Sequence, residues 1–347
     1  MQASSSKKTG RLLVWLGNPF FSVRLPDYGW RMVSARFESD QVHTWQSILE
    51  LTGGEAPDVV VVGDTSSPPI LTGMEEFPCL TVFYVVDSHI HSWYPVYAQG
   101  FDLVLVTLRE HLPDFIKGRL HASRVWWTPP YARDQDRPPQ PHPEPEWDLV
   151  FSGTVSKERA PKRYRFLMEL KEAFPGLHIT YDPFVRVYPK ARLVLNETRG
   201  ELNFRIFEVL GLGRCLLTPD SGPPLTDLFT HGKELILYPA HNVQAIIPLI
   251  TGLLADDSRR EQIAAAGLAA VDARHRAGIR AGEWSSRVEA LFSSGEAGTI
   301  IEERKAASRY IATHFLRLLY LHHAETVGLE SLRQAYLETA KQSRNML

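Results

Sequence analysis

An asparagine, an arginine and a glutamate stand close together in the segment LNFRIFEVLGLGRCLLTPDSG, residues 202–222. The segment predicts a helix that begins near Asn203, a preferred N-cap residue, and ends at the glycines that follow. Arg205 and Glu208 are three positions apart, so they share one face of that helix. The start of a helix attracts anions, and the guanidinium of Arg205 adds a positive charge and can donate two hydrogen bonds to a phosphate. A carboxylate such as that of Glu208 can bind the 2′ and 3′ hydroxyls of a ribose. The pair predicts a nucleotide site or, alternatively, a solvated Arg–Glu pair of little energetic weight.

Short apolar runs rich in Val and Leu recur on both sides of this segment and predict strands that are buried on both faces, as in a parallel sheet. The predicted strands are 11–17, 58–64, 81–87, 101–107, 147–153, 177–181, 191–196, 214–218 and 234–239. The predicted helices include 41–52, 157–174, 242–255, 257–272 and 279–293. Because strands and helices alternate, the sequence predicts an α/β protein with doubly wound parallel sheets.

The length of 347 residues predicts about two domains. Residues 137–147 hold five prolines in eleven positions and have no apolar periodicity, which is typical of a linker. We therefore predict an N-terminal Rossmann-like domain over 1–135, a Pro-rich hinge over 136–147, a C-terminal Rossmann-like domain over 148–295 and a helical tail over 296–347.

The tail carries an apolar stripe at helical spacing, formed by Ile311, Phe315, Leu318, Leu319 and Leu321. The stripe predicts packing on the chain's own core. Contact with a second copy or with a partner protein, or contact with a membrane surface, is the alternative.

Net charge is −2 and charged residues make up 22% of the chain, so no global field would recruit nucleic acid or anionic lipid. Cys79 and Cys215 both lie in apolar runs, which predicts two buried thiols. The spacing of Cys and His residues indicates neither a zinc site nor a disulfide framework. With no signal-peptide pattern and no apolar run long enough to span a bilayer, we expect a cytoplasmic protein without a transmembrane segment.

The run NFRIFEVLGLGRCLLT, 203–218, resembles the C-terminal half of the spore-maturation (CgeB-like) glycosyltransferases. The likeness continues in order through 148–154, 193–198, 224–239 and 258–271. It covers about 147–293 well, 81–130 weakly and the tail not at all.

This resemblance implies the GT-B fold, in which two Rossmann-like domains face a cleft that holds the donor, here with an additional helical tail. It implies a metal-independent, hexosyltransferase-type glycosyltransferase without a cofactor. The donor would be a nucleotide-diphosphate sugar, with UDP as the expected nucleotide, and the acceptor a protein, glycan or small molecule. The alternatives are a non-catalytic partner or scaffold protein on the same fold and a sugar-nucleotide epimerase.

The resemblance also assigns roles to individual residues. Glu208 would bind the donor ribose, while Arg205 would neutralise the diphosphate as its main catalytic contribution. The other donor-binding residues would be Gly153, Thr154, Arg163 with its neighbour Lys162, Asn203 and Thr218. For Lys162 and Arg163 a solvated helix face is the alternative. Many retaining relatives carry a second glutamate whose position falls on Gly200 here, and Glu201 misses it by one place, so retention or inversion stays open.

In the first domain, DSHIHSW (87–93) follows a predicted strand. Asp87 and His89 are the candidates there for a general base that takes a proton from the acceptor, because ligands bind beyond the carboxyl ends of parallel strands. The alternatives are a capping Asp and a surface His. A metal site at His89 and His91 would need a third ligand, and the sequence indicates none.

Two aromatic segments, 18–30 and 125–131, could stack on a sugar or simply pack in the core. The Asp-Gln-Asp triplet at 134–136 lies in the Pro-rich stretch rather than after a buried strand. We therefore interpret it as coincidental and predict no metal site.

Overall fold

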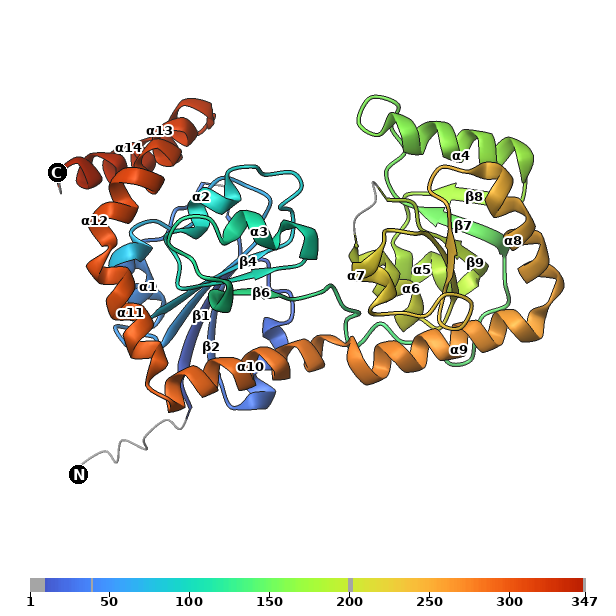
Figure 1. Ribbon diagram of the computed structural model, residues 1–347, viewed down its shortest axis with the longest axis horizontal. Helices are drawn as coiled ribbons and strands as arrows, with labels where there is room; N and C mark the ends of the chain where they lie inside the picture. The colour runs from blue at the N-terminus through green and yellow to red at the C-terminus, as the bar shows by residue number, and fades with distance from the viewer. Residues whose placement is uncertain (1–9, 39, 199–201, 346–347) are drawn as a thin grey trace. The chain divides into compact units, whose positions relative to one another are not determined.

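The computed structural model describes residues 10–38, 40–198 and 202–345. The chain divides into two compact units, Met1–Pro129 with Ala281–Leu347, and Pro130–Arg280. No helix of the described residues is long and apolar enough to cross a membrane. Each unit is built on its own parallel sheet (Figure 1).

The first unit contains a six-stranded sheet in the order β2-β1-β3-β4-β5-β6, and every neighbouring pair is parallel. Its strands are β1 Leu12–Gly17, β2 Arg31–Ala35, β3 Val59–Gly63, β4 Leu80–Val85, β5 Leu103–Val106 and β6 Val125–Trp127. Every residue of β1, β3, β4 and β5 is buried, which confirms the strands predicted from continuous apolar runs. The edge strand β2 is only half-buried and was not predicted.

Helices cover the sheet of the first unit. Those within its N-terminal part are α1 Trp45–Leu51, α2 Tyr94–Ala98 and α3 Leu112–Phe115. The helix α10, Ala277–Ser293, crosses the boundary between the two units in sequence, and the chain then continues through α11 Glu296–Ala306, α12 Ser308–Ile311, a π-helical turn at Ala312–Leu316, α13 Arg317–Thr326 and α14 Glu330–Asn345. α1 begins with a capping box in which the Thr44 hydroxyl accepts from the Ser47 backbone N–H.

The tail is part of the first unit rather than a separate domain, in contrast to the predicted boundary at residue 296. Of the predicted stripe, Ile311 and Leu319 are buried in the core of the first unit, whereas Leu318 is 67% exposed. The core also takes in Tyr320 from α13 and Tyr336 from α14. The prediction that the stripe packs on the chain's own core therefore holds for most of its length.

One buried arginine joins α11 to the sheet of the first unit. Arg304 is fully buried and donates to the backbone carbonyls of Met74, Phe77 and Cys79. Its Nε lies 3.3 Å from Oδ1 of Asp102, which is equally buried. This network fixes the first helix of the tail because its partners lie in the segment before β4 or directly before β5.

The second unit contains a five-stranded parallel sheet in the order β11-β10-β9-β7-β8. Its strands are β7 Trp147–Ser152, β8 Leu177–Thr180, β9 Ala191–Leu195, β10 Cys215–Pro219 and β11 Ile236–Tyr238. Its helices are α4 Pro161–Ala173, α5 Phe184–Val187, α6 Phe204–Gly211, α7 Pro223–Thr226, α8 Val243–Ala255 and α9 Asp257–Arg274. Cys79 and Cys215, one in each unit, are free and buried as predicted.

The predicted Pro-rich hinge, 136–147, lies inside the second unit. Arg276, which is buried, donates to the carbonyl of Asp136 at 2.8 Å and to that of Gly211 at 2.9 Å. At the other end of the stretch, the backbone N–H of Glu146 donates to the carbonyl of Lys190. Both ends of this proline-rich stretch are therefore tied to the second unit, and the boundary lies earlier, at residues 129–130.

Candidate functional site

The two central strands of the second sheet meet at a topological switch point. β7 pairs with β8 on one side and with β9 on the other, and β9 leads on to β10 and β11. The connections that leave β7 and β9 therefore run in opposite directions. In open α/β sheets such a point, at the carboxyl ends of the strands, is where ligands bind. Gly153, a predicted donor-binding residue, follows β7, and Asn196, which had no predicted role, follows β9, so both lie at this point.

Arg205, in the first turn of α6, reaches across this switch point. Its Nη1 donates to Oδ1 of the buried Asn196 at 3.3 Å, and its Cζ lies 5.3 Å from the centroid of the Phe151 ring. A Cβ at Gly153 would stand only 2.8 Å from Nη2 of Arg205. A side chain at this position would therefore displace the guanidinium, which lies against the backbone where β7 ends.

A buried polar cluster holds the start of α6 in place. The side chain of Asn196 donates to the Thr218 hydroxyl at 3.0 Å and to Oδ1 of Asn203 at 3.4 Å. Asn203 returns a bond from its Nδ2 to Oδ1 of Asn196 at 3.3 Å. Because Thr218 is 1% exposed, it lies behind Asn196 and orients that side chain instead of lining an open pocket.

Asn203 occupies the N-cap position of α6 in an extended conformation, as predicted, but its side chain makes no capping hydrogen bond. The side chain turns to Asn196 instead. The first backbone N–H groups of a helix have no acceptor within the helix, and Asn203 supplies none for α6. An anion that bound at this helix start would meet those donors, the helix dipole and the Arg205 guanidinium.

Glu208 lies one turn after Arg205 and is half-buried. Burial raises its pKa to about 7, and the charge of Asp136 acts in the same direction. Arg205 and Arg133 act in the opposite direction and lower the pKa. Arg133 itself forms a bidentate pair with Asp136, at 2.6 and 3.1 Å. Glu208 is thus a poorly hydrated acceptor beside two guanidinium groups, and a ligand that donates hydrogen bonds would favour its charged form.

The sequence did not predict the roles of Glu197 and His241, which join the site from β9 and β11. Glu197 is fully buried and accepts a hydrogen bond from the Tyr238 hydroxyl at 2.7 Å. Its other oxygen lies 2.9 Å from Nδ1 of His241. His241 has a positive φ of 58° and lies three residues after the strand that ends at Tyr238, so its position after a buried strand was the available signal.

Residues from the start of α4 reach the same region. Nη1 of Arg163 donates to the carbonyl of Thr154 at 3.4 Å, while Lys162 is exposed. The pKa of His241 is lowered, first by burial and then by the charges of Lys162 and Arg163. Lys162 and Arg163 at the start of α4 therefore lie close enough to His241 to interact with it electrostatically.

The acidic triplet at 134–136 has structural partners. Asp136 is buried and pairs with Arg133, and Oδ2 of Asp134 accepts the backbone N–H of Gly278 at 3.0 Å. In the part of the chain that the structure describes, no group of three or more His, Cys, Asp or Glu side chains could hold a metal ion. Gly200 and Glu201 lie outside the described residues.

In the first unit, a buried carboxylate organises the loop that carries Asp87. Asp64, which follows β3, accepts the backbone N–H groups of Val86 and Asp87 at 2.8 and 2.7 Å and the hydroxyl of Tyr94 at 2.5 Å. Asp87 is half-buried, and His89 is exposed without a hydrogen-bond partner in the described chain. His91, not His89, contacts the neighbouring loop, with its Nε2 at 2.8 Å from the Ser66 hydroxyl.

The aromatic segments near this loop are mostly packed inside the first unit. Phe21 and Trp30 are buried, and Nε1 of Trp30 donates to the Ser285 hydroxyl at 2.8 Å. Trp126 is buried beneath Arg287, whose Cζ lies 3.7 Å from the ring centroid. These contacts favour core packing over sugar stacking as the role of the aromatic side chains.

Comparison with known proteins gives a family for part of the chain. Residues 145–286 match the family described as "Glycosyl transferase-like", which is less than half of the chain and contains the switch point with Arg205 and Glu208. No curated protein sequence shows a significant match.

Solved structures resemble the chain over most of its length. HepE from Anabaena, in complex with UDP and glucose, has a TM-score of 0.54 at 10% identity and covers 81% of this chain and 100% of its own. Sucrose-phosphate synthase from Thermosynechococcus elongatus has a TM-score of 0.57 at 10% identity and covers 82% of this chain and 100% of its own. A glycosyltransferase from Rickettsia africae ESF-5 has a TM-score of 0.53 at 8% identity and covers 82% and 99%. The chain therefore has the predicted GT-B fold, with additional C-terminal helices, and carries a glycosyl transferase-like domain.

Proposed function

We propose that the chain is a glycosyltransferase that moves a sugar from a nucleotide-diphosphate donor to an acceptor, with the donor held by the second unit. The observation that carries the proposal is the position of Arg205. Its guanidinium lies against the backbone of Gly153 at the switch point and is fixed there by the buried Asn196. A diphosphate placed there would be bound by charge-assisted hydrogen bonds and by a helix start.

In this proposal Arg205 and the start of α6 stabilise the leaving diphosphate. Negative charge grows on the leaving group as the glycosidic bond to the nucleotide breaks, and prearranged donors stabilise that charge. Arg163 lies beside the same region and adds to the positive potential, whereas the lowered pKa of His241 favours its neutral form. We propose that these side chains take the role that a metal ion plays in other transferases.

Glu208 would bind the ribose hydroxyls of the donor. The Glu208 carboxylate is half-buried next to Arg205 and Arg133, and burial raises its pKa to about 7. Two ribose hydroxyls would supply hydrogen bonds that stabilise the carboxylate and offset part of its poor hydration. UDP is the first nucleotide to test, since HepE was solved with UDP and with UDP-glucose.

The acceptor side of the reaction is assigned to the first unit. We propose Asp87, positioned by Asp64, as the base that takes the acceptor proton, with the exposed His89 as the other candidate. The run from Asn203 to Thr218 and the residues that precede it support membership of the spore-maturation (CgeB-like) subgroup.

The ribose assignment is tested by comparing UDP with 2′-deoxy-UDP in isothermal titration calorimetry. Wild type should bind UDP at least about tenfold more tightly, because the deoxy nucleotide leaves one carboxylate oxygen of Glu208 without its donor. In Glu208→Gln the preference should fall to within about threefold. Equal binding of both nucleotides by wild type would remove Glu208 from the donor site.

Turnover is tested by incubating UDP-glucose and UDP-N-acetylglucosamine with the full chain and measuring the UDP released, with and without candidate acceptors. Release that disappears in Arg205→Ala but continues in Arg259→Ala, an exposed arginine on α9, would support the transferase. Interconversion of the UDP-sugar without UDP release would point to an epimerase instead.

A further inference from the structure

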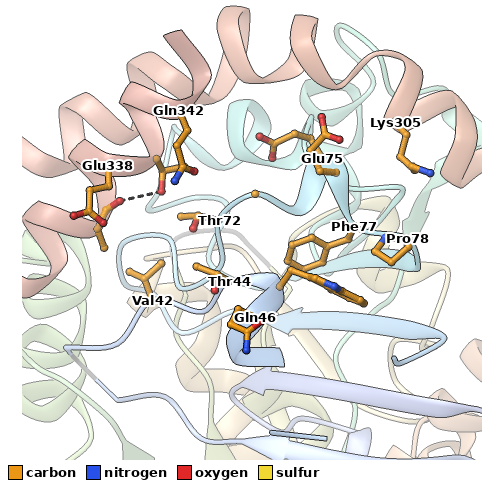
Figure 2. A pocket seen from close by; sticks show the side chains of 15 residues that line it. Val42, Thr44, Gln46, Thr72, Glu75, Phe77, Pro78, Lys305, Glu338 and Gln342 are labelled. Atoms are coloured by element: carbon orange, nitrogen blue, oxygen red, sulfur yellow. Dashed lines mark hydrogen bonds between the residues drawn. The ribbon is translucent and has the colours of Figure 1, made fainter. Parts of the chain in front are cut away.

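A cavity of about 750 Å³ in the first unit lies beneath the tail helices (Figure 2). α1 and the loop at 72–78 form one side, and α11 and α14 form the other. The volume falls in the range of small-molecule sites. All of its lining residues belong to the first unit, whereas Arg205 and Glu208 belong to the second.

One side chain of this cavity is buried without a partner. Glu75 is only 3% exposed, and its Oε2 has no hydrogen-bond partner among the described residues. The nearby Arg304 does not supply one, because its two terminal nitrogens donate to three carbonyls and to Thr81, and its Nε lies 3.3 Å from Oδ1 of Asp102. An unpaired buried carboxyl oxygen is unfavourable, and burial raises the pKa of Glu75 to about 7.

The charges around Glu75 favour a cation. Glu76 and Glu338, both exposed, also line the cavity. Lys305 is the single basic side chain of the lining, and it lies 3.1 Å from Glu302 outside the cavity. The cavity therefore carries an excess of negative charge, and its most buried acidic oxygen is the one that needs a donor.

The other lining residues fit a small polar ring. Trp45 and Phe77 present two aromatic rings whose centroids are 5.0 Å apart, and aromatic faces bind both sugar rings and ammonium groups. Gln46 and Gln342 bring amide groups, which donate and accept hydrogen bonds, from opposite sides of the cavity (Figure 2).

We infer that this cavity binds an amino sugar or a similarly sized polyhydroxylated amine, with the ammonium group on Oε2 of Glu75 and the ring against Trp45 and Phe77. The ammonium would donate the hydrogen bond that the carboxylate lacks. The ring hydroxyls would meet the amide groups of Gln46 and Gln342. This site goes beyond the proposed transferase function and does not depend on it.

The test uses the full chain at pH 7 and three matched probes, glucosamine, N-acetylglucosamine and glucose, in titration calorimetry and saturation-transfer NMR. Glucosamine should bind saturably, and the two neutral sugars at least about tenfold more weakly, because they lack the charge. In Glu75→Gln, which keeps the shape of the side chain, the Kd for glucosamine should rise at least about tenfold.

Two controls separate this site from its surroundings. Glu76→Gln removes the same charge at an exposed position of the cavity, and Glu110→Gln removes it from an exposed position elsewhere in the unit; both should keep the Kd within about threefold. Arg205→Ala should bind glucosamine as wild type does, and Glu75→Gln should bind UDP as wild type does. Either proposal can then fail without the other.

The inference is overturned if glucosamine shows no saturable binding up to about 20 mM, a limit that corresponds to a very weak site. It is also overturned if all three sugars bind equally, or if Glu75→Gln leaves the Kd unchanged in a protein whose circular dichroism is native. If Glu76→Gln lost as much affinity for glucosamine as Glu75→Gln, binding would depend on the general negative charge of the surface, and the assigned contact with Glu75 would likewise be rejected.

Discussion

Replacing Arg304 by methionine should destabilise the first unit more than the same replacement of any exposed charged residue in the tail. The methionine keeps an unbranched apolar side chain in the space of the arginine stem but removes all of its donors. In the native chain the guanidinium donates at 2.6 Å to the Phe77 carbonyl, at 2.9 Å to the Cys79 carbonyl and at 3.0 Å to the Thr81 hydroxyl. It also forms the ion pair with Asp102, and both side chains are fully buried.

The magnitude follows from what the substitution leaves behind. Asp102 keeps its bonds from the backbone N–H and hydroxyl of Thr81, at 2.9 and 3.1 Å, but loses its only buried cation within ion-pair distance among the described residues. Breaking a buried ion pair from one side lowers the free energy of unfolding by about 3–5 kcal/mol. Carbonyls left without donors add to the loss. We expect a total of about 4 kcal/mol.

The assay is urea unfolding followed by tryptophan fluorescence, with hydrogen exchange of α11 and α14 as a local readout. Lys305→Met is the matched control, since it removes a charge at the next position, where the pair with Glu302 is exposed; it should change the free energy of unfolding by less than about 0.5 kcal/mol. Adding Asp102→Asn to Arg304→Met should recover about 1–3 kcal/mol, because the orphaned charge is removed. A loss below about 1 kcal/mol in Arg304→Met, or no recovery in the double variant, would refute the reasoning.

Gly153→Ala should fold, with a loss of about 1 kcal/mol, but should weaken UDP binding about tenfold in calorimetry, because the new Cβ displaces the Arg205 guanidinium; unchanged affinity would contradict the close approach. The stability of Glu75→Gln relative to wild type, measured as the difference in their free energies of unfolding, should rise by up to about 3 kcal/mol as pH rises from 4.5 to 7.5. The folded pKa of Glu75, about 7, lies above its unfolded value of 4.5, so its stability contribution is complete below 4.5 and is lost through 7; a constant difference across urea titrations at these pH values would reject the raised pKa. Asp64→Ala should lower the free energy of unfolding by about 2–4 kcal/mol and alter the amide NMR signals around Asp87, since three backbone donors and the Tyr94 hydroxyl lose their acceptor; an unshifted Asp87 amide signal would argue against that positioning role.

The sequence predicted the buried strands well because a strand covered on both faces must be continuously apolar. It did not predict β2, Arg31–Ala35, since this edge strand is half-buried and carries no such run. It also missed β6, Val125–Trp127, which is three residues long and reads as an aromatic segment.

The candidate site was predictable only as far as local spacing reaches. Arg205 and Glu208 lie on one short helix, so their neighbourhood follows from sequence distance. Arg133 acts on Glu208, and His241 contacts Glu197, from distant positions in the second unit, and no local sequence pattern reports such contacts.

The tail was harder to predict than the strands, because its anchor has an unusual residue type. Arg304 stands in the charged run EERKAA, which is typical of a solvated helix face, yet it is fully buried. Arginine is almost never fully buried unless it is paired, and its partner Asp102 lies about two hundred residues earlier in the chain. Only the fold shows that the tail completes the first unit.

The central claim is that Arg205 and Glu208 hold a nucleotide diphosphate at the switch point of the second sheet. The most direct measurement is a calorimetric and thermal-shift screen of UDP, GDP, dTDP, CMP and ADP against wild type, Arg205→Ala, Glu208→Ala and the control Arg259→Ala. We predict that one diphosphate, with UDP as the expected one, binds wild type and the control equally and at least about tenfold more weakly to the other two variants. Failure of every nucleotide to bind the folded chain, or equal binding by all four proteins, would contradict the claim.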